Sequence, residues 1–164
     1  MRVLGIDPGY DRLGVAVLER NGSKEHILFS DCLITNRKES HAKRLSFIGV
    51  EIKKIIETWQ PEYVAIEKLF FNQNITNGIK VAEVRGVVIY ESHLAECIIC
   101  EYGPQEIKVA VTGYGRSDKA SIIAMVKRIT GISKPKVLDD EYDAIAIGIT
   151  CLAHEGSVKK SLST

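Results

Sequence analysis

Acidic residues close two short apolar segments of this sequence and cluster again near its C-terminus. Asp7 follows the apolar residues 3–6, and Glu67 follows the apolar residues 63–66. The cluster lies in the run Leu-Asp-Asp-Glu-Tyr-Asp. Within it, Asp140 and Asp143 are three residues apart and share one face of a helix, while Asp139 and Asp143, four apart, share one almost as well. The spacing alone leaves both pairs open.

Convergent carboxylates define the chemistry that these residues could perform. They repel one another, so leaving them bare costs stability. A hard divalent cation removes that cost, and ligands that are all oxygen favour magnesium or manganese. Two such ions about 4 Å apart stabilise both the attacking and the leaving oxygen when a phosphodiester is displaced in line. The pattern therefore suggests transfer of a phosphoryl group to water.

Each acid also has an ordinary explanation. An aspartate at the end of a strand commonly serves a turn. Asp139 and Asp140, at the start of a helix, are expected for capping and for the helix dipole alone. The indication of a site therefore comes from the combination and not from any single acid.

The elements that must position these acids begin with three strands. Residues 2–7 form a compact apolar strand, and residues 12–20 alternate well enough for a second. Asn21-Gly22 is a strong hairpin signal, and residues 24–35 supply the third strand. Short links between the three predict an antiparallel meander.

The hydrophobic period changes after the third strand. Apolar residues recur at steps of three and four from about Ser40 to Trp59, which predicts a helix that Pro61 ends. Residues 62–67 read as a fourth strand, 74–96 as a second helix and 97–102 as a fifth strand. If the first and fourth strands are parallel neighbours, Asp7 and Glu67 project from the same edge of the sheet.

The remaining residues look helical. Residues 105–113 form a short piece, and Ser117 can cap a helix that runs to about Thr130. The last helix is expected from about Asp139, with Gly156 as its stop. The tail 157–164 has almost nothing apolar and is expected to be mobile.

Length and order together predict one α/β domain. The 164 residues suit a single core, so we assign residues 1–156 to one nuclease domain and 157–164 to a flexible C-terminal tail. Three strands followed by alternating helices and strands predict a mixed five-stranded sheet with helices on both faces, the ribonuclease-H-like arrangement. Neither a membrane-spanning run nor a signal region is recognisable, so we expect a cytoplasmic protein.

The cysteines give no sign of a metal centre of their own. Cys97 and Cys100 have the C-x-x-C spacing, but no second pair or nearby histidine completes a zinc site. They are better explained as buried thiols within a strand.

Three segments, GIDPGYDRLGVAV, AIEKLFF and DDEYDAIAIGIT, resemble the RuvC family of crossover-junction endonucleases in sequence and spacing. The resemblance covers nearly the whole chain. It implies that the family's acids fall on Asp7, Glu67, Asp140 and Asp143, which leaves Asp139 as a helix cap. Tyr10 departs from the smaller residue that the family usually has.

The resemblance also implies DNA contacts. Phe70 matches the aromatic residue that wedges into the junction, and Lys108 and Lys119 match two lysines near the bound phosphates. On spacing alone, Phe70 would be a core residue and the lysines solvated surface. The net charge is only +1, so any positive field must be local, built from a few lysines and bound cations.

The family implies a homodimer that nicks two symmetric strands of a four-way junction with two magnesium ions per site, for which manganese substitutes. A branch-migration helicase complex is the expected partner. An actin-like or sugar-kinase ATPase would share the Gly-Ile-Asp segment, but it needs a second domain. Ribonuclease H would place an aspartate where this chain has Glu67. A binding protein without catalysis would gain nothing from acids that face phosphates.

Overall fold

The computed structural model describes residues 1–22, 24–69 and 75–161. In this part of the chain the elements, in order, are β1 (Arg2–Asp7), β2 (Arg12–Asn21), β3 (Lys24–Ile34), α1 (His41–Trp59), β4 (Tyr63–Glu67), α2 (Ile75–Leu94), β5 (Ile98–Tyr102), α3 (Pro104–Thr112), α4 (Lys119–Thr130) and α5 (Asp139–Ser161). Among these residues no helix is both long and apolar enough to cross a bilayer.

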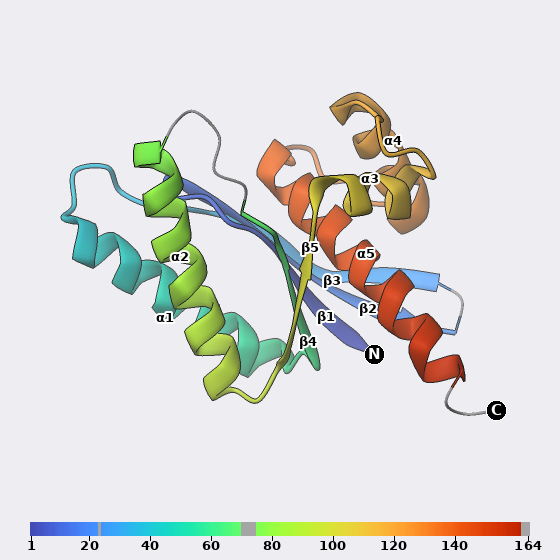
Figure 1. Cartoon of the computed structure of the whole chain (residues 1–164), viewed down its shortest axis with the longest axis horizontal. Helices are drawn as coiled ribbons and strands as arrows, with labels where there is room; N and C mark the ends of the chain where they lie inside the picture. The colour runs from blue at the N-terminus through green and yellow to red at the C-terminus, as the bar shows by residue number, and fades with distance from the viewer. Residues whose placement is uncertain (23, 70–74, 162–164) are drawn as a thin grey trace.

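The strands form one mixed sheet in the order β3-β2-β1-β4-β5. The β1–β2 and β2–β3 pairs are antiparallel, whereas β1–β4 and β4–β5 are parallel. Figure 1 shows α1 and α2 on one face of the sheet and α5, with α3 and α4 near its N-terminal part, on the other. The predicted five-stranded sheet with helices on both faces is confirmed.

Alternation along the strands builds two cores, one on each face. In β1, Leu4 and Ile6 join the core that includes α1 and α2, whereas Val3 joins the core of α3, α4 and α5. Because successive side chains of a strand point to opposite faces, Gly5 and Asp7 share the face of Val3. The strand therefore delivers Asp7 to the side that α5 covers.

The backbone of helix α5 lies in direct contact with the backbone of the sheet, because glycines at the contact points have no side chain. A Cβ atom on Gly5 would lie 2.2 Å from the carbonyl oxygen of Ala144, and one on Gly14 would lie 1.9 Å from that of Asp140. Any larger residue at either position would push the helix away from β1 and β2. These contacts bring the acidic first turns of α5 close to the strand ends.

The cap predicted for α4 was wrong, whereas α1 begins close to where the hydrophobic period predicted it. At α1 the Ser40 side chain accepts a hydrogen bond from the Lys43 amide. At α4 the cap is Asp118, whose carboxylate accepts from the Ser121 amide at 2.8 Å. Ser117 instead donates its hydroxyl hydrogen bond to the Tyr114 carbonyl, because it still belongs to the preceding turn.

Gly156 does not stop the last helix, which continues to Ser161. A Cβ atom at Gly156 would lie 2.4 Å from Nη1 of Arg20, and the same Nη1 donates to the Leu152 carbonyl at 2.6 Å. The glycine therefore leaves room for the end of the Arg20 side chain and does not form a left-handed turn. Residues 157–161 belong to the helix, so the predicted end of the last helix at Gly156 was wrong, while the division into a domain 1–156 and a tail 157–164 stays a prediction.

Candidate active site

The ends of β1 and β4 place two acids side by side on the α5 face. The strands are parallel neighbours with Ile6 opposite Ile66, so Asp7 and Glu67 occupy equivalent positions one residue further on. In β4, Tyr63 and Ala65 belong to the core on the α5 side, and Glu67 has the same parity. Both carboxylates therefore project toward α5 from one edge of the sheet.

Helix α5 supplies the remaining acids from its first turns. Asp7 lies opposite Gly14 in the β1–β2 pairing, and the Asp140 backbone packs directly on Gly14. Asp140 is thereby positioned beside the end of β1. Asp139 is the first residue of the helix and not its cap, so that interpretation was wrong; its carboxylate lies 3.5 Å from Nζ of Lys119.

The electrostatics of Asp7 reflect this crowding. Burial, followed by the negative charges of Asp143, Glu67 and Asp140, raises the pKa of Asp7 from 3.8 to about 7, although Lys119 opposes the shift. Burial and the charge of Asp143 also raise the pKa of Glu67. Asp7 is therefore close enough to be influenced by each of the other three acids that the family resemblance implies.

Two of the four acids are held by basic side chains. Arg12 lies with Nη2 2.9 Å from Oδ2 of Asp140, and Lys119 lies with Nζ 2.9 Å from Oδ2 of Asp143. Within the described ranges, no group of three or more histidine, cysteine, aspartate or glutamate side chains is arranged to hold a metal ion. The acids offer only oxygen atoms, which suits a hard divalent cation. To bind one, Asp140 would have to release Arg12, and Asp143 would have to release Lys119.

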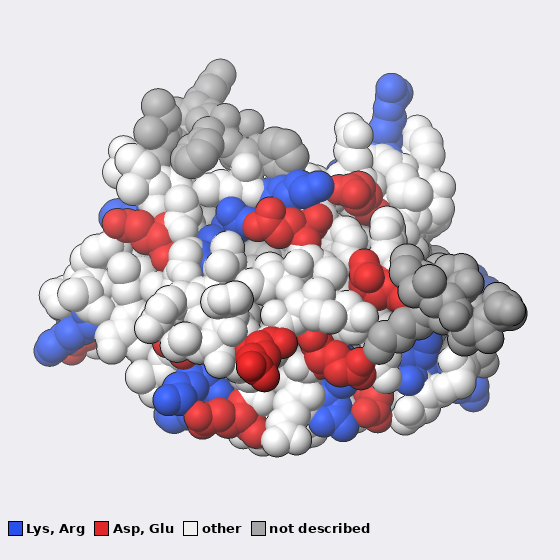
Figure 2. Space-filling view, turned by 60° about the horizontal axis from the view of Figure 1, so that its bottom comes forward, with Lys and Arg blue, Asp and Glu red and all other residues white. Residues whose placement is uncertain are grey.

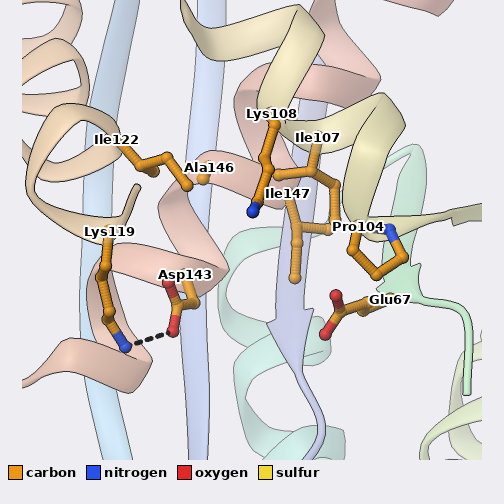
Figure 3. A pocket seen from close by; sticks show the side chains of 9 residues that line it. All are labelled: Glu67, Pro104, Ile107, Lys108, Lys119, Ile122, Asp143, Ala146 and Ile147. Atoms are coloured by element: carbon orange, nitrogen blue, oxygen red, sulfur yellow. Dashed lines mark hydrogen bonds and ion pairs between the residues drawn. The ribbon is translucent and has the colours of Figure 1, made fainter. Parts of the chain in front are cut away.

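A pocket of about 230 Å³ opens beside these acids. Its lining includes Glu67 and Asp143 as well as Lys108 from α3 and Lys119 from α4. In Figure 3 the amine of Lys108 points into the space between the two acids, and Lys119 is tied to Asp143. The pocket thus combines carboxylates, which would hold divalent cations, with two positive side chains, which would attract a phosphate.

On the face of the molecule shown in Figure 2, the positive charge is not gathered in one large patch. On the face shown in Figure 2, acidic and basic side chains lie beside one another and neither sign dominates. The net charge of +1 agrees with this pattern. The third predicted DNA contact, Phe70, lies outside the described residues, so its role stays a prediction.

Sequence reasoning missed Arg12 and Glu141. Arg12 is the first residue of β2, and nothing in its neighbourhood in the sequence indicates that Asp140 will be its partner. Glu141 is buried and accepts from Ser30 Oγ at 2.5 Å and from Lys134 Nζ at 2.7 Å, which ties the start of α5 to β3. Acids in a run look alike in sequence, and only the rotation of the helix separates the buried Glu141 from Asp140 and Asp143.

A mixed sheet of this order, with carboxylates at the ends of β1 and β4 and at the start of α5, defines the ribonuclease-H-like class of nucleases. Residues 3–151 match the family described as "Crossover junction endodeoxyribonuclease RuvC". The chain belongs to the RuvC family, whose members are metal-dependent nucleases.

Relatives and solved structures agree with this membership. RuvC of Petrotoga mobilis is 38% identical over 98% of this chain and 96% of its own length, and RuvC of Finegoldia magna is 41% identical over 91% of each. RuvC of T. thermophilus in complex with a Holliday junction substrate has a TM-score of 0.89 and 30% identity, covering 96% of this chain and 97% of that one. A yeast mitochondrial Holliday junction resolvase, with a TM-score of 0.71 and 14% identity over 96% of this chain and 80% of its own, shares the fold.

Proposed function

We propose that this chain resolves four-way (Holliday) DNA junctions by hydrolysing one phosphodiester in each of two symmetrically placed strands. The observation that carries the proposal is the gathering of Asp7, Glu67, Asp140 and Asp143 at one edge of a RuvC fold. Burial first, and then the negative charges of the other three acids, raise the pKa of Asp7 to about 7. A pure binding protein would not gain from negative charges placed where phosphates must lie.

The four acids are the proposed ligands of two magnesium ions, with manganese as a substitute. Bound there, the ions would supply Lewis-acid activation of water and support for the departing 3′ oxygen. The chain's own part is to hold the carboxylates on the rigid ends of β1, β4 and α5. Lys108 and Lys119 line the same pocket and are the proposed contacts to the DNA phosphates, while Phe70 is the proposed wedge at the crossover.

A homodimer is the proposed assembly, because a junction with two equivalent strands to cut suits a two-fold symmetric enzyme. Exposed apolar side chains on α1 and α2 offer a surface for it. Phe47 and Val50 on α1 are 41% and 49% exposed, and Ile79, Tyr90 and Leu94 on α2 are 52%, 61% and 62% exposed. Analytical ultracentrifugation of Leu94→Glu beside the unmodified chain tests this surface. The variant dimer should have the higher dissociation constant, so that monomers persist at protein concentrations at which the unmodified chain is dimeric.

By analogy with the family, the partner of the dimer is a branch-migration helicase complex. A protein that acts on recombining chromosomes would work in the bacterial cytoplasm, which is where we place it. Co-purification of the tagged chain with that helicase, in the presence of synthetic junctions, tests the partnership.

The proposed activity is tested by a nicking assay on synthetic four-way junctions, with and without magnesium. We expect paired nicks in opposite strands only when magnesium is present. Linear duplex of the same sequence serves as the control and should remain intact. Equal cleavage of duplex and junction would contradict junction resolution, and cleavage in EDTA would contradict the role of the metal.

A further inference from the structure

Arg12 is the one basic residue of β2 that contacts the proposed metal-binding acids in the described part of the chain. It has the parity of Gly14 in β2 and so projects to the face that α5 covers. Its Nη2 atom lies 2.9 Å from Oδ2 of Asp140. The same Oδ2 atom is 4.0 Å from Sγ of Cys32 on the adjacent strand β3.

We propose that Arg12 competes with divalent cations for the Asp140 carboxylate and thereby sets the metal concentration at which the site fills. The proposal rests on the proposed function, in which Asp140 is a ligand. A guanidinium and a metal ion are both attracted by the same negative charge and repel each other, so each contact with the carboxylate weakens the other. Arginine stays protonated at every physiological pH, and therefore the competition is always present.

The burial of the two partners explains why Arg12 can be displaced and why it matters. The Arg12 side chain is 49% exposed, so its charge can return to water at little cost, whereas the Asp140 side chain is 19% exposed and remains in the site. Two positive charges a few ångströms apart repel each other, and water screens this repulsion only in part where one of the groups is half-buried. Arg12 therefore lowers metal affinity as long as it stays beside Asp140.

The alternative is that Arg12 orients Asp140 as a ligand and so favours metal binding. The two roles predict opposite changes in metal affinity when Arg12 is replaced: competition predicts a gain, and orientation of Asp140 predicts a loss. Arg37, which pairs with Asp11 at 2.7 Å and has a side chain 78% exposed, offers a matched control. It is the same kind of ion pair, but its acid is not among the proposed ligands.

The experiment is a titration of the DNA-free protein with Mn²⁺, in which the electron paramagnetic resonance signal of the unbound ion measures how much Mn²⁺ is bound. We expect Arg12→Gln to bind at least threefold more tightly than the unmodified chain. Arg12→Lys keeps the charge and should remain within twofold, and so should Arg37→Gln. Calorimetric melting should agree, with a larger rise in Tm on adding Mg²⁺ for Arg12→Gln than for the unmodified chain.

Weaker or unchanged binding by Arg12→Gln would overturn the competition, and so would an equal gain in Arg37→Gln, since the effect would then be one of overall charge. Absence of Mn²⁺ binding in every variant would remove the competition as well. The junction-nicking assay separates the two proposals. Magnesium-dependent nicking together with unchanged metal affinity in Arg12→Gln would leave the nuclease function intact and refute only the role of Arg12.

Discussion

At the scale of single residues, the position of Asp7 lowers the stability of the fold but suits the proposed chemistry. Its carboxylate is brought into a partly buried position beside Glu67, Asp140 and Asp143, where its charged form is disfavoured. The same position is the one in which a divalent cation could be shared between the strand ends and α5. If Asp7 holds a divalent cation as proposed, the cation would offset this unfavourable charge.

Asp7→Asn tests both the cost to stability and the role in the proposed chemistry. The carboxyl pKa is raised from 3.8 to about 7, so the protonated form stabilises the fold at low pH, and this stability is lost as pH rises from 3.8 through 7. Asn mimics the protonated form, and each pKa unit is worth about 1.4 kcal/mol. In EDTA, the variant should exceed the unmodified protein by a few kcal/mol in unfolding free energy at pH 8, and by less at pH 5.

The same variant should lose junction nicking but keep junction binding in calcium. Chemical denaturation at the two pH values and a nicking assay at saturating magnesium provide the measurements. Normal nicking would remove Asp7 from the site, and a stability difference independent of pH would contradict the assigned pKa.

At the scale of elements, α5 decides which acids face the strands. Its backbone is pressed onto Gly5 and Gly14, and buried Glu141 fixes its first turn to Ser30 and Lys134. A helix held in this way cannot rotate freely, so neighbouring acids have different surroundings. Asp140 lies over Gly14, whereas Asp139 is 62% exposed in its side chain.

The register of α5 predicts different outcomes for two adjacent substitutions. Asp140→Asn should nearly abolish nicking, because a charged ligand is lost beside the end of β1. Asp139→Asn should leave nicking largely intact, because it removes only an exposed ion pair with Lys119, and such pairs contribute at most about 1 kcal/mol. Nicking rates at saturating magnesium distinguish them, and the reverse order would place the ligand one residue earlier.

The packing of α5 on the sheet predicts a stability effect at Gly14. A methyl group there would meet the Asp140 carbonyl oxygen at 1.9 Å, so Gly14→Ala should lower the unfolding free energy by about 1–3 kcal/mol. Gly86→Ala on α2 is the matched control: nothing lies within 4 Å of its added Cβ, and alanine favours the helix by up to about 1 kcal/mol. Equal melting temperatures for the two variants would show that the packing of α5 on the sheet does not require a glycine at position 14.

At the scale of the whole molecule, DNA binding has to arise from a local field. With a net charge of +1, the protein as a whole barely attracts a polyanion. Lys108 and Lys119 converge on the pocket from α3 and α4, so a few charges act at one place. The affinity for DNA should therefore depend on these residues and on bound cations more than on the total charge.

Replacing both lysines tests this local field. If each contacts one phosphate, Lys108→Ala with Lys119→Ala should make the salt dependence of junction binding shallower by roughly two, and by up to about twice that per dimer. Affinity should fall on all junction sequences alike, since phosphate contacts carry no base information. Binding would be measured in calcium over a range of salt. Lys53→Ala with Lys54→Ala, both exposed on α1, is the control; an equal change there would make overall charge the cause.

The sequence by itself determined the strands and helices, the sheet and the first two acids. Alternation in residues 3–6 and 63–66 and the Asn21-Gly22 turn are local signals, because side-chain parity and turn geometry are set by neighbours in the chain. The family resemblance then chose Asp140 over Asp139. Local reasoning failed at Gly156, whose neighbour Arg20 is distant in the chain, and at Ser117, whose hydroxyl serves the turn that precedes α4.

Only the tertiary structure decided how charges meet across elements. The pairing of Arg12 with Asp140 joins residues far apart in the chain, and it exists because β2 and the start of α5 touch at Gly14. The burial of Glu141 and the pKa of Asp7 depend in the same way on the rotation of α5 against the sheet. Charge interactions act through space, and a pattern of residue types along the chain does not contain the distances that determine them.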